Sequence, residues 1–417
     1  MERRLPPSEL DDLVRDINRL EGEAEPAAAA GADLDGLELR APAGEAPALL
    51  DAPAQPVVSG DEPLERLLAP MVARGASDLL LIAGLPPVLR VHGRLERLSA
   101  PVLDADTIRG LFAAHLGGRL REELERDGAA DFSLRVPPAA GRRGAWRLRV
   151  NLHLQRGQLA AALRALPQEI PTLASLNLPP ALAELVKPHR GLILVCGPTG
   201  SGKSSTLAAL VGEINRTRSC HVITIEDPVE YEHPHGRAIV EHIEVGRDAP
   251  SFAAALRGCL RQDPDVVLVG EMRDLETIAT ALTAAETGHL ILSTLHTNDV
   301  SQAVHRIVDV FPPPQQPQIR QQLALSLHAI AAQQLVPRAD GSGRVPAIEL
   351  LIASYPVRHH IRNDTVEKMY NEISMGARAG MISLEASLAD LVGRGVITLE
   401  EARVRSQRPE LLESLLR

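Results

Sequence analysis

The alternation of apolar and polar positions predicts a first folded region over residues 61–166. Between Trp146 and Leu154 every second residue is apolar, a pattern typical of a strand with one buried face, and Arg149 stands on its polar face. Further helical and strand patterns lead us to expect an α+β unit built on an antiparallel sheet. The predicted helices span 64–74 and 105–126, and the other predicted strands span 78–82, 88–92, 131–136 and 158–166.

A different pattern begins near residue 189, where fully apolar runs alternate with segments of helical periodicity. Such runs are typical of strands buried on both faces, so we expect an α/β domain with a parallel sheet. Beyond about residue 315 we expect helices and one short strand pair near 334 and 348. Prolines between 167 and 188 mark the connection between the two regions. The predicted strands are 192–196, 221–225, 265–269 and 290–293.

The first 60 residues differ from both regions. Apolar residues fall on one face of a short helix over 8–22, which Ser8 can cap. Residues 23–60 are rich in Ala, Gly and Pro and hold few large apolar groups, which predicts a disordered extension. The short helix is either a docking peptide or a marginal helix without a partner, and the sequence leaves both interpretations open.

Composition and charge argue against DNA-binding, membrane-spanning and secreted proteins. The chain has 417 residues, of which 45% are hydrophobic and only 2% aromatic, so the cores should consist of Leu, Val, Ala and Ile. A net charge of −10 argues against binding to duplex DNA as the main function. No apolar run reaches the roughly 18 residues of a membrane span, and no signal peptide is visible. The widely spaced cysteines predict reduced, buried thiols in a cytosolic protein and no zinc site; they are Cys196, Cys220 and Cys259.

One segment carries the most specific chemical pattern, G-x-x-x-x-G-K-[ST], between a predicted strand and a predicted helix. Its glycines let backbone N–H groups turn toward phosphate oxygens, and the helix that begins near Lys203 adds the positive end of its dipole. We expect Lys203 to contact the β- and γ-phosphates of ATP and Ser204 to ligate Mg²⁺. A chance glycine-rich turn is the alternative. The predicted phosphate-binding residues are Gly197, Pro198, Thr199, Gly200, Ser201, Gly202, Lys203, Ser204 and Ser205.

Three further polar segments follow predicted strands of the same region, where the sites of doubly wound sheets lie. Residues 226–230 hold three carboxylates, which suit metal-bound water and the orientation of an attacking water; the alternative is a solvated acidic loop. Glu271 follows an apolar strand, which is the Walker B arrangement. His296 lies in the segment 294–298 and is interpreted as a γ-phosphate sensor, with a structural histidine as the alternative.

Together these segments resemble the secretion-superfamily ATPases and, within them, the PilT-type motors of type IV pilus retraction. The resemblance covers residues 77–400 with few gaps, and its motifs are highly specific as a set. The matching stretches are SDLLLIAGLPPVLRVHG (77–93), LRVNLHLQRG (148–157), GPTGSGKSSTL (197–207), ITIEDPVEY (223–231), FAAALRGCLRQDPDVVLVGEMRDLETIATALTAAETGHL (252–290), STLHTN (293–298) and GMISLEASLADLV (380–392).

The resemblance implies an N-terminal PAS-like domain followed by a RecA-like P-loop ATPase domain, in a homohexameric ring with ATP between the two domains. It implies that Glu230 is the catalytic glutamate, that Glu271 reaches Mg²⁺ through water, and that His296 belongs to the His box. It also implies that Arg149 and Arg164 engage the phosphates, although the sequence alone indicates surface arginines. The expected division is an extension over 1–60, a PAS-like domain over 61–166, a linker over 167–188, an ATPase domain over 189–405 and a tail over 406–417.

The implied function is hydrolysis of ATP to ADP and phosphate by a ring that powers pilus retraction and twitching motility. The lack of a tetracysteine insert favours this branch over assembly and type II secretion ATPases. Segment 356–363 resembles the retraction element AIRNLIRE but has His359-His360 at its centre, which leaves the direction of action open. Other interpretations are an accessory retraction ATPase, a type II secretion or pilus assembly ATPase, a DNA translocase and a non-hydrolysing nucleotide-gated scaffold.

The implied partners are further copies of the chain, an inner-membrane pilus platform protein and other pilus ATPases, with no nucleic acid. We expect a cytoplasmic protein that lies at the inner face of the cytoplasmic membrane without inserting into it. An exposed helix with Arg358 and Arg362 on one face would present two positive charges to an acidic partner. The sequence leaves open which pilus or secretion system is served, the ring symmetry and the role of the extension.

Overall fold

The computed structural model describes residues 64–91, 93–136 and 146–417, which belong to one compact unit spanning 54–417. The helix expected over 8–22 and the extension expected over 23–60 lie outside the described residues.

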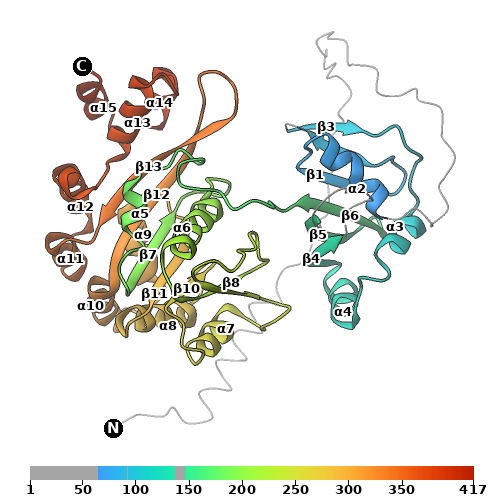
Figure 1. Ribbon diagram of the computed structural model, residues 1–417, viewed down its shortest axis with the longest axis horizontal. Coiled ribbons are helices and arrows are strands. Elements are labelled where there is room, and N and C mark those ends of the chain that lie inside the picture. Colours follow the sequence, from blue (N-terminus) through green and yellow to red (C-terminus); the bar gives the residue numbers. More distant parts are fainter. Residues whose placement is uncertain (1–63, 92, 137–145) are drawn as a thin grey trace, which may run out of the picture. The chain divides into compact units, whose positions relative to one another are not determined.

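The first sheet is antiparallel and has the strand order β3-β2-β1-β6-β5-β4 (Figure 1), so the α+β prediction is confirmed. Helices α2 (Leu64–Ala73) and α3 (Ala105–Phe112) pack against its buried face, where Leu68, Ile108 and Phe112 are fully buried. The strands are β1 (Asp78–Leu81), β2 (Val88–Val91), β3 (Arg94–Arg97), β4 (Ala129–Val136), β5 (Trp146–Gln155) and β6 (Gln158–Ala165).

Three details of this region differ from the sequence predictions. The single helix expected over 105–126 is two helices, α3 and α4 (Gly118–Asp127), because the flexible pair Gly117-Gly118 interrupts it. Strand β3 was not predicted, since all four of its side chains are exposed and show no alternation. Leu154 is 51% exposed, although it continues the apolar alternation of β5, because it lies beyond the hydrophobic cluster near the β5–β6 turn.

The second sheet has the order β13-β12-β7-β11-β10-β8-β9, and its neighbours are parallel except for the β12–β13 pair, which confirms the parallel-sheet prediction. Strand β9 was not predicted, because its polar residues hide the apolar pattern. The strand pair expected to be short is long instead, with 11 residues in β12 and nine in β13. The strands are β7 (Gly191–Cys196), β8 (His221–Glu226), β9 (Ile239–Glu244), β10 (Val266–Val269), β11 (Leu290–Leu295), β12 (Leu327–Pro337) and β13 (Arg344–Ile352).

This sheet is buried on both faces, as its fully apolar runs predict. Alternate residues of β7 serve two hydrophobic clusters: Leu192 and Leu194 belong to one, and Ile193 and Val195 to the other. The helices of this region are α5 (Ala181–Glu184), α6 (Lys203–Thr217), α7 (Phe252–Cys259), α8 (Leu275–Glu286), α9 (Val300–Asp309), α10 (Gln316–Ser326), α11 (Tyr355–Arg362), α12 (Met369–Met375), α13 (Leu384–Gly393), α14 (Leu399–Arg405) and α15 (Pro409–Leu415), with 3₁₀ turns at Val366–Lys368 and Gly376–Ala379.

The thiols follow the prediction only in part, since Cys196 and Cys259 are buried but Cys220 is half-buried. The C-terminal helices α13, α14 and α15 lie close together beyond β12 and β13 (Figure 1) and form a hydrophobic cluster with Val336 and Val345 of these strands. No helix among the described residues combines the length and apolar character needed to cross a lipid bilayer.

Helix α11 corrects the expectation that Arg358 is exposed. Its guanidinium donates hydrogen bonds to the backbone carbonyls of Leu325 at 2.9 Å and Ala353 at 3.1 Å, and to that of Ala324. Because two of these carbonyls lie at the C-terminal end of α10, the positive charge meets the negative end of that helix. Arg358 is therefore a structural contact between two helices and is not presented to a partner.

Candidate phosphate-binding site

The predicted P-loop lies between β7 and α6, so its strand and helix context is as expected. Gly197, Gly200 and Gly202 have φ angles of 147°, 76° and 90°, in the region that favours glycine. A Cβ atom at Gly197 would collide with the carbonyl oxygen of Gln333. The glycine pattern is therefore required by the backbone conformation and by a close neighbour.

Gln333 on β12 is a site residue that the sequence analysis missed. Its buried side-chain amide donates to the carbonyl oxygen of Ser201 at 2.6 Å and accepts from the Thr206 hydroxyl at 2.8 Å. These two hydrogen bonds thus connect the P-loop and the start of α6 to β12. The only signal in the sequence was a polar residue inside an otherwise apolar run, and nothing local connects it to a loop 130 residues earlier.

Lys203 is buried, and its ammonium group donates to the carbonyl oxygens of Gly197 at 2.9 Å and Pro198 at 3.0 Å. Burial lowers the pKa of Lys203, an effect that the charges of Cys196, Glu271 and Glu230 oppose. The Ser201 hydroxyl is buried in the same loop and has no hydrogen-bond partner among the residues that the structure describes. A buried cation beside a backbone cradle and an unpartnered hydroxyl fit an anionic oxygen group.

The structure brings Lys203, Glu271 and His296 together, as the sequence predicted. The Nδ1 atom of His296 lies 3.5 Å from the Lys203 ammonium, and its Nε2 atom lies 3.7 Å from the Glu271 carboxylate. These residues follow three neighbouring parallel strands, β7, β10 and β11, at their carboxyl ends. Burial, followed by the Lys203 charge, lowers the pKa of His296 and favours its neutral form. Arg273 also holds the Glu271 carboxylate, at 2.7 Å.

The acidic segment, residues 226–230, begins at the end of β8 and lies close to the P-loop. The Glu230 backbone N–H donates to the Glu226 carboxylate at 3.2 Å, and burial raises the pKa of Glu226 to about 7. The Tyr231 hydroxyl lies 2.8 Å from the Ser205 hydroxyl, which links this segment to the P-loop. Glu230 is half-buried, so its carboxylate is accessible to a small ligand, whereas Glu226 serves the backbone of the segment.

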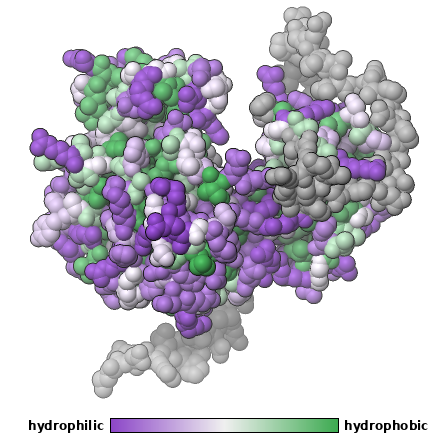
Figure 2. Space-filling model, viewed as in Figure 1, coloured by the Kyte–Doolittle hydropathy of each residue, from purple (hydrophilic) through white to green (hydrophobic). Residues whose placement is uncertain are grey.

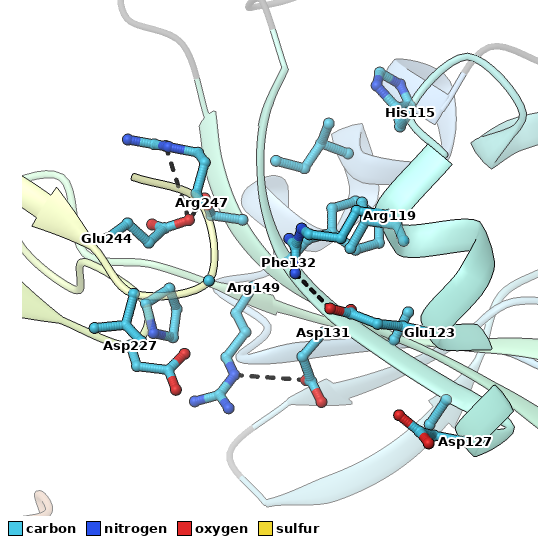
Figure 3. Close-up of a pocket in the computed structure, with 18 of the residues that line it drawn as sticks. His115, Arg119, Glu123, Asp127, Asp131, Phe132, Arg149, Asp227, Glu244 and Arg247 are labelled. Atoms are coloured by element: carbon cyan, nitrogen blue, oxygen red, sulfur yellow. Dashed lines mark hydrogen bonds and ion pairs between the residues drawn. The ribbon is translucent and has the colours of Figure 1, made fainter. Parts of the chain in front are cut away.

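The two arginines carried over from the family lie in the first sheet. Arg149 is 3.9 Å from Asp131. Together with Asp227 it lines a cavity of about 510 Å³, and Figure 3 shows the Arg149 side chain extending toward Asp227. Arg164 is 67% exposed and donates to Asp78 at 2.9 Å. Both ion pairs are with carboxylates of their own sheet, and among the described residues neither arginine pairs with the P-loop.

Comparison with known proteins places this site in context. The family model described as "Type II/IV secretion system protein" matches residues 152–402. A type IV pilus retractation ATPase, PilT, of Pseudomonas aeruginosa is 42% identical over 347 residues, which cover 83% of this chain and 99% of that protein. A twitching motility protein of Neisseria gonorrhoeae is 40% identical over 329 residues, covering 79% and 86% of the two chains. A crystal structure of the pilus retraction motor PilT with bound ADP is similar at a TM-score of 0.77 and 45% identity, covering 85% of this chain and all of that one.

Proposed function

Because the chain belongs to the type II/IV secretion system family and, within it, to the PilT-type retraction ATPases, we propose that it is a hexameric motor that hydrolyses ATP to power type IV pilus retraction. The relatives named as a retraction ATPase and a twitching motility protein support this role over that of an accessory, assembly or type II secretion ATPase. The resemblance stated from the motifs is confirmed by these similarities across most of the chain.

One observation carries the proposed chemistry: Lys203, Glu271 and His296 converge at the carboxyl ends of three parallel strands, beside a P-loop. This arrangement supports binding of the β- and γ-phosphates of ATP by Lys203 and by the backbone of residues 197–205. A cavity of about 410 Å³ beside Ser205 at the start of α6 offers space for the nucleoside. The ADP in the related PilT crystal supports the same ligand class.

The site also suits Mg²⁺, because the Ser204 hydroxyl would supply an oxygen ligand and the Glu271 carboxylate would hold a water bound to the ion. Bound Mg²⁺ neutralises charge that develops on the phosphate oxygens. Glu230 orients the attacking water, Lys203 holds the phosphates, and neutral His296 senses the γ-phosphate between Lys203 and Glu271. Arg149 and Arg164 reach the phosphates from the first sheet, which requires them to leave the carboxylates that they contact here.

We further propose the division into an extension (1–60), a PAS-like domain (61–166), a linker (167–188), an ATPase domain (189–405) and a tail (406–417). Separate hydrophobic clusters under the two sheets support two folded domains. Within the proposed linker and tail, Leu182 and Leu412 are buried in clusters of the second region, so parts of both segments pack with the ATPase domain. The motor works as a homohexamer at the inner face of the cytoplasmic membrane, where it meets an inner-membrane platform protein and other pilus ATPases. It needs no nucleic acid.

The test is turnover of ATP by the purified full-length chain. Glu230→Gln should keep nucleotide affinity and lose turnover by roughly 10²-fold or more, because the attacking water is no longer oriented. Lys203→Ala should lose nucleotide affinity as well. Removal of Mg²⁺ by a chelator should stop turnover, and added Mg²⁺ should restore it.

Each alternative function predicts a different outcome of this test. A wild-type chain that binds ATP without turnover would be a nucleotide-gated scaffold, and turnover stimulated by DNA would indicate a translocase. Normal turnover by Glu230→Gln would move the catalytic role to Glu226 or Glu271. In cells, loss of a retraction motor should give excess surface pili without twitching, whereas loss of pili altogether would indicate an extension or secretion motor.

A further inference from the structure

Arg147 on β5 links the first sheet to the segment that carries Glu230. Its guanidinium donates to the carbonyl oxygen of Glu230 at 3.2 Å and to that of Val229, and it pairs with the Glu232 carboxylate at 3.0 Å. The side chain is only 11% exposed. This residue therefore reaches from one sheet to the catalytic segment of the other, and two of its contacts are with the backbone.

Two backbone carbonyls and one carboxylate suit the planar guanidinium, which has five N–H donors in a fixed fork. Burial lowers the pKa of Arg147, and the charge of Glu232 opposes this effect. The guanidinium nevertheless stays charged, because arginine is not deprotonated in proteins. If the peptide groups of Val229 and Glu230 rotated away, the buried guanidinium would lose two of its acceptors and keep only Glu232, which is unfavourable for a buried charge. The direction of the Glu230 side chain depends on this backbone.

The preceding peptide unit, between Pro228 and Val229, is held by a second contact that also starts in the first sheet. The Ser133 hydroxyl on β4 donates to the buried carboxylate of Glu244 at 2.7 Å, and the other oxygen of Glu244 accepts the Val229 N–H at 3.3 Å. Val229 thus has its carbonyl bound by Arg147 and its N–H bound through Glu244. Two adjacent strands of the first sheet hold the segment from both sides.

We propose that Arg147 is a positioning residue for ATP hydrolysis: it aligns the Glu230 carboxylate by holding the backbone of residues 229 and 230, so turnover requires contact between the first sheet and the acidic segment. The inference rests on the proposed ATPase function and on Glu230 as the residue that orients water. It assigns the first sheet a role separate from phosphate binding, because the Arg147 guanidinium is already engaged by the carbonyls of residues 229 and 230 and by Glu232.

Arg135 provides a matched control on the neighbouring strand β4. It pairs with the same Glu232 carboxylate, but its side chain is 60% exposed. Within the part of the chain that the structure describes, it makes no hydrogen bond to the backbone of residues 229 and 230. Arg135→Ala therefore removes the same charge as Arg147→Ala and spares the backbone contacts. A difference between the two variants reports on the positioning of the segment and not on net charge.

The experiment measures kcat and KM for ATP with the full-length chain. Arg147→Ala should lower kcat about 10- to 100-fold, as expected for misplacement of a catalytic group by about 1 Å, and should leave KM and the affinity for ADP within about twofold. Arg135→Ala should keep kcat within about twofold. Ser133→Ala, which removes a single hydroxyl group, should lower kcat by a few-fold and serves as the second test if Arg147→Ala does not fold.

A double-mutant cycle separates positioning from a general structural role. In the Glu230→Gln background, Arg147→Ala should cause no further fall in kcat, because its effect passes through the Glu230 carboxylate. Equal kcat values for wild type, Arg147→Ala and Ser133→Ala would overturn the inference, as would an additive loss in the Glu230→Gln background or a loss confined to KM. Absence of turnover in the wild-type chain would instead refute the proposed function itself.

Discussion

The two sheets of this protein bury their strands in different ways. In the second sheet every residue of β7, β10 and β11 is buried, whereas in the first sheet β3 is fully exposed and β5 alternates between buried and accessible residues. These three strands therefore have no accessible face, and the residues that they offer to a ligand lie where the strands end. The antiparallel sheet has a polar face, from which Arg147 and Arg149 extend.

This difference explains how the candidate site is assembled. Lys203, Glu271 and His296 come from the ends of parallel strands, whose convergence follows from the fold class. The groups contributed by the first sheet come from the middle of strands, so their targets depend on how that sheet meets the acidic segment. The mixed charges around Arg149 in Figure 3 illustrate such a surface.

The largest difference between the sheets should appear in stability. Leu194→Ala removes a fully buried side chain from the core of the second sheet and should lower the free energy of unfolding by about 2–5 kcal/mol. Leu154→Ala in β5, where the side chain is half-exposed, should cost less than about 1 kcal/mol. Urea unfolding followed by circular dichroism measures both, and equal losses would contradict the assignment of Leu154 to the surface.

Buried carboxyl groups of the second sheet should make stability depend on pH. Burial raises the pKa of Glu349 on β13 to about 7, above its ordinary value, so the folded state holds a proton that the unfolded state releases. This contribution is complete below the unfolded pKa and is lost as pH rises through about 7. Glu349→Gln keeps an acceptor for the Val300 N–H at 3.2 Å and removes the titration.

Between about pH 4.5 and 7, the stability of Glu349→Gln relative to wild type should therefore rise by up to about 3 kcal/mol. Thermal melts of both proteins across this range measure the effect. The first region provides a contrast: Asp104 accepts the Thr107 N–H at the start of α3, and this hydrogen bond lowers the pKa of the Asp104 carboxyl group. A constant difference between the two proteins across the range would show that Glu349 stays ionised.

The polar face of the first sheet should contribute to turnover through Arg149 more than through Arg164. Arg149→Ala should lower kcat/KM for ATP about 10-fold, the size of a charge-assisted contact, because this side chain lines the same cavity as Asp227 of the acidic segment. Arg164→Ala should have a smaller effect, since its guanidinium is held by Asp78. Steady-state kinetics of both variants test this order, and wild-type values for both would make them surface arginines.

The smallest expected effects concern α11. Arg358→Ala should lower the free energy of unfolding by about 1 kcal/mol, because partly exposed carbonyls at the end of α10 lose a charged donor, whereas Arg362→Ala should change it by less than about 0.5 kcal/mol. Thermal melts compare the two variants. If Arg362→Ala keeps ATP turnover but abolishes twitching, Arg362 is the partner contact of this helix; normal twitching would exclude that role.

Partner contacts of α11 and α12 cannot be inferred from apolarity alone. The face in Figure 2 shows hydrophobic residues as scattered patches among hydrophilic ones. Exposed apolar side chains such as Tyr355 and Met375 occur on these helices, but nothing in the structure shows what covers them. Genetic tests of retraction are therefore better directed at charged residues such as Arg362, whose exchange does not disturb a core.

The sequence by itself determined the elements whose information is local. Fully apolar runs predicted the central strands of the second sheet, alternation predicted β5, and the spacing of glycines around Lys203 predicted the P-loop. Positions of Glu271 and His296 followed as well, because the ends of parallel strands must meet at one edge. Their roles, and that of Glu230, came from the family resemblance and stay predictions until turnover is measured.

Only the tertiary structure decided the contacts between residues that are distant in the sequence. Gln333 supports the P-loop from a strand 130 residues later, Arg147 binds carbonyls of the acidic segment, and Arg358 caps α10 instead of facing a partner. When a side chain donates to a backbone carbonyl, the identity of the accepting residue does not reveal the contact, because every residue has a carbonyl group. Periodicity fixes which way a side chain points along its own element, whereas its partner depends on how separate elements pack.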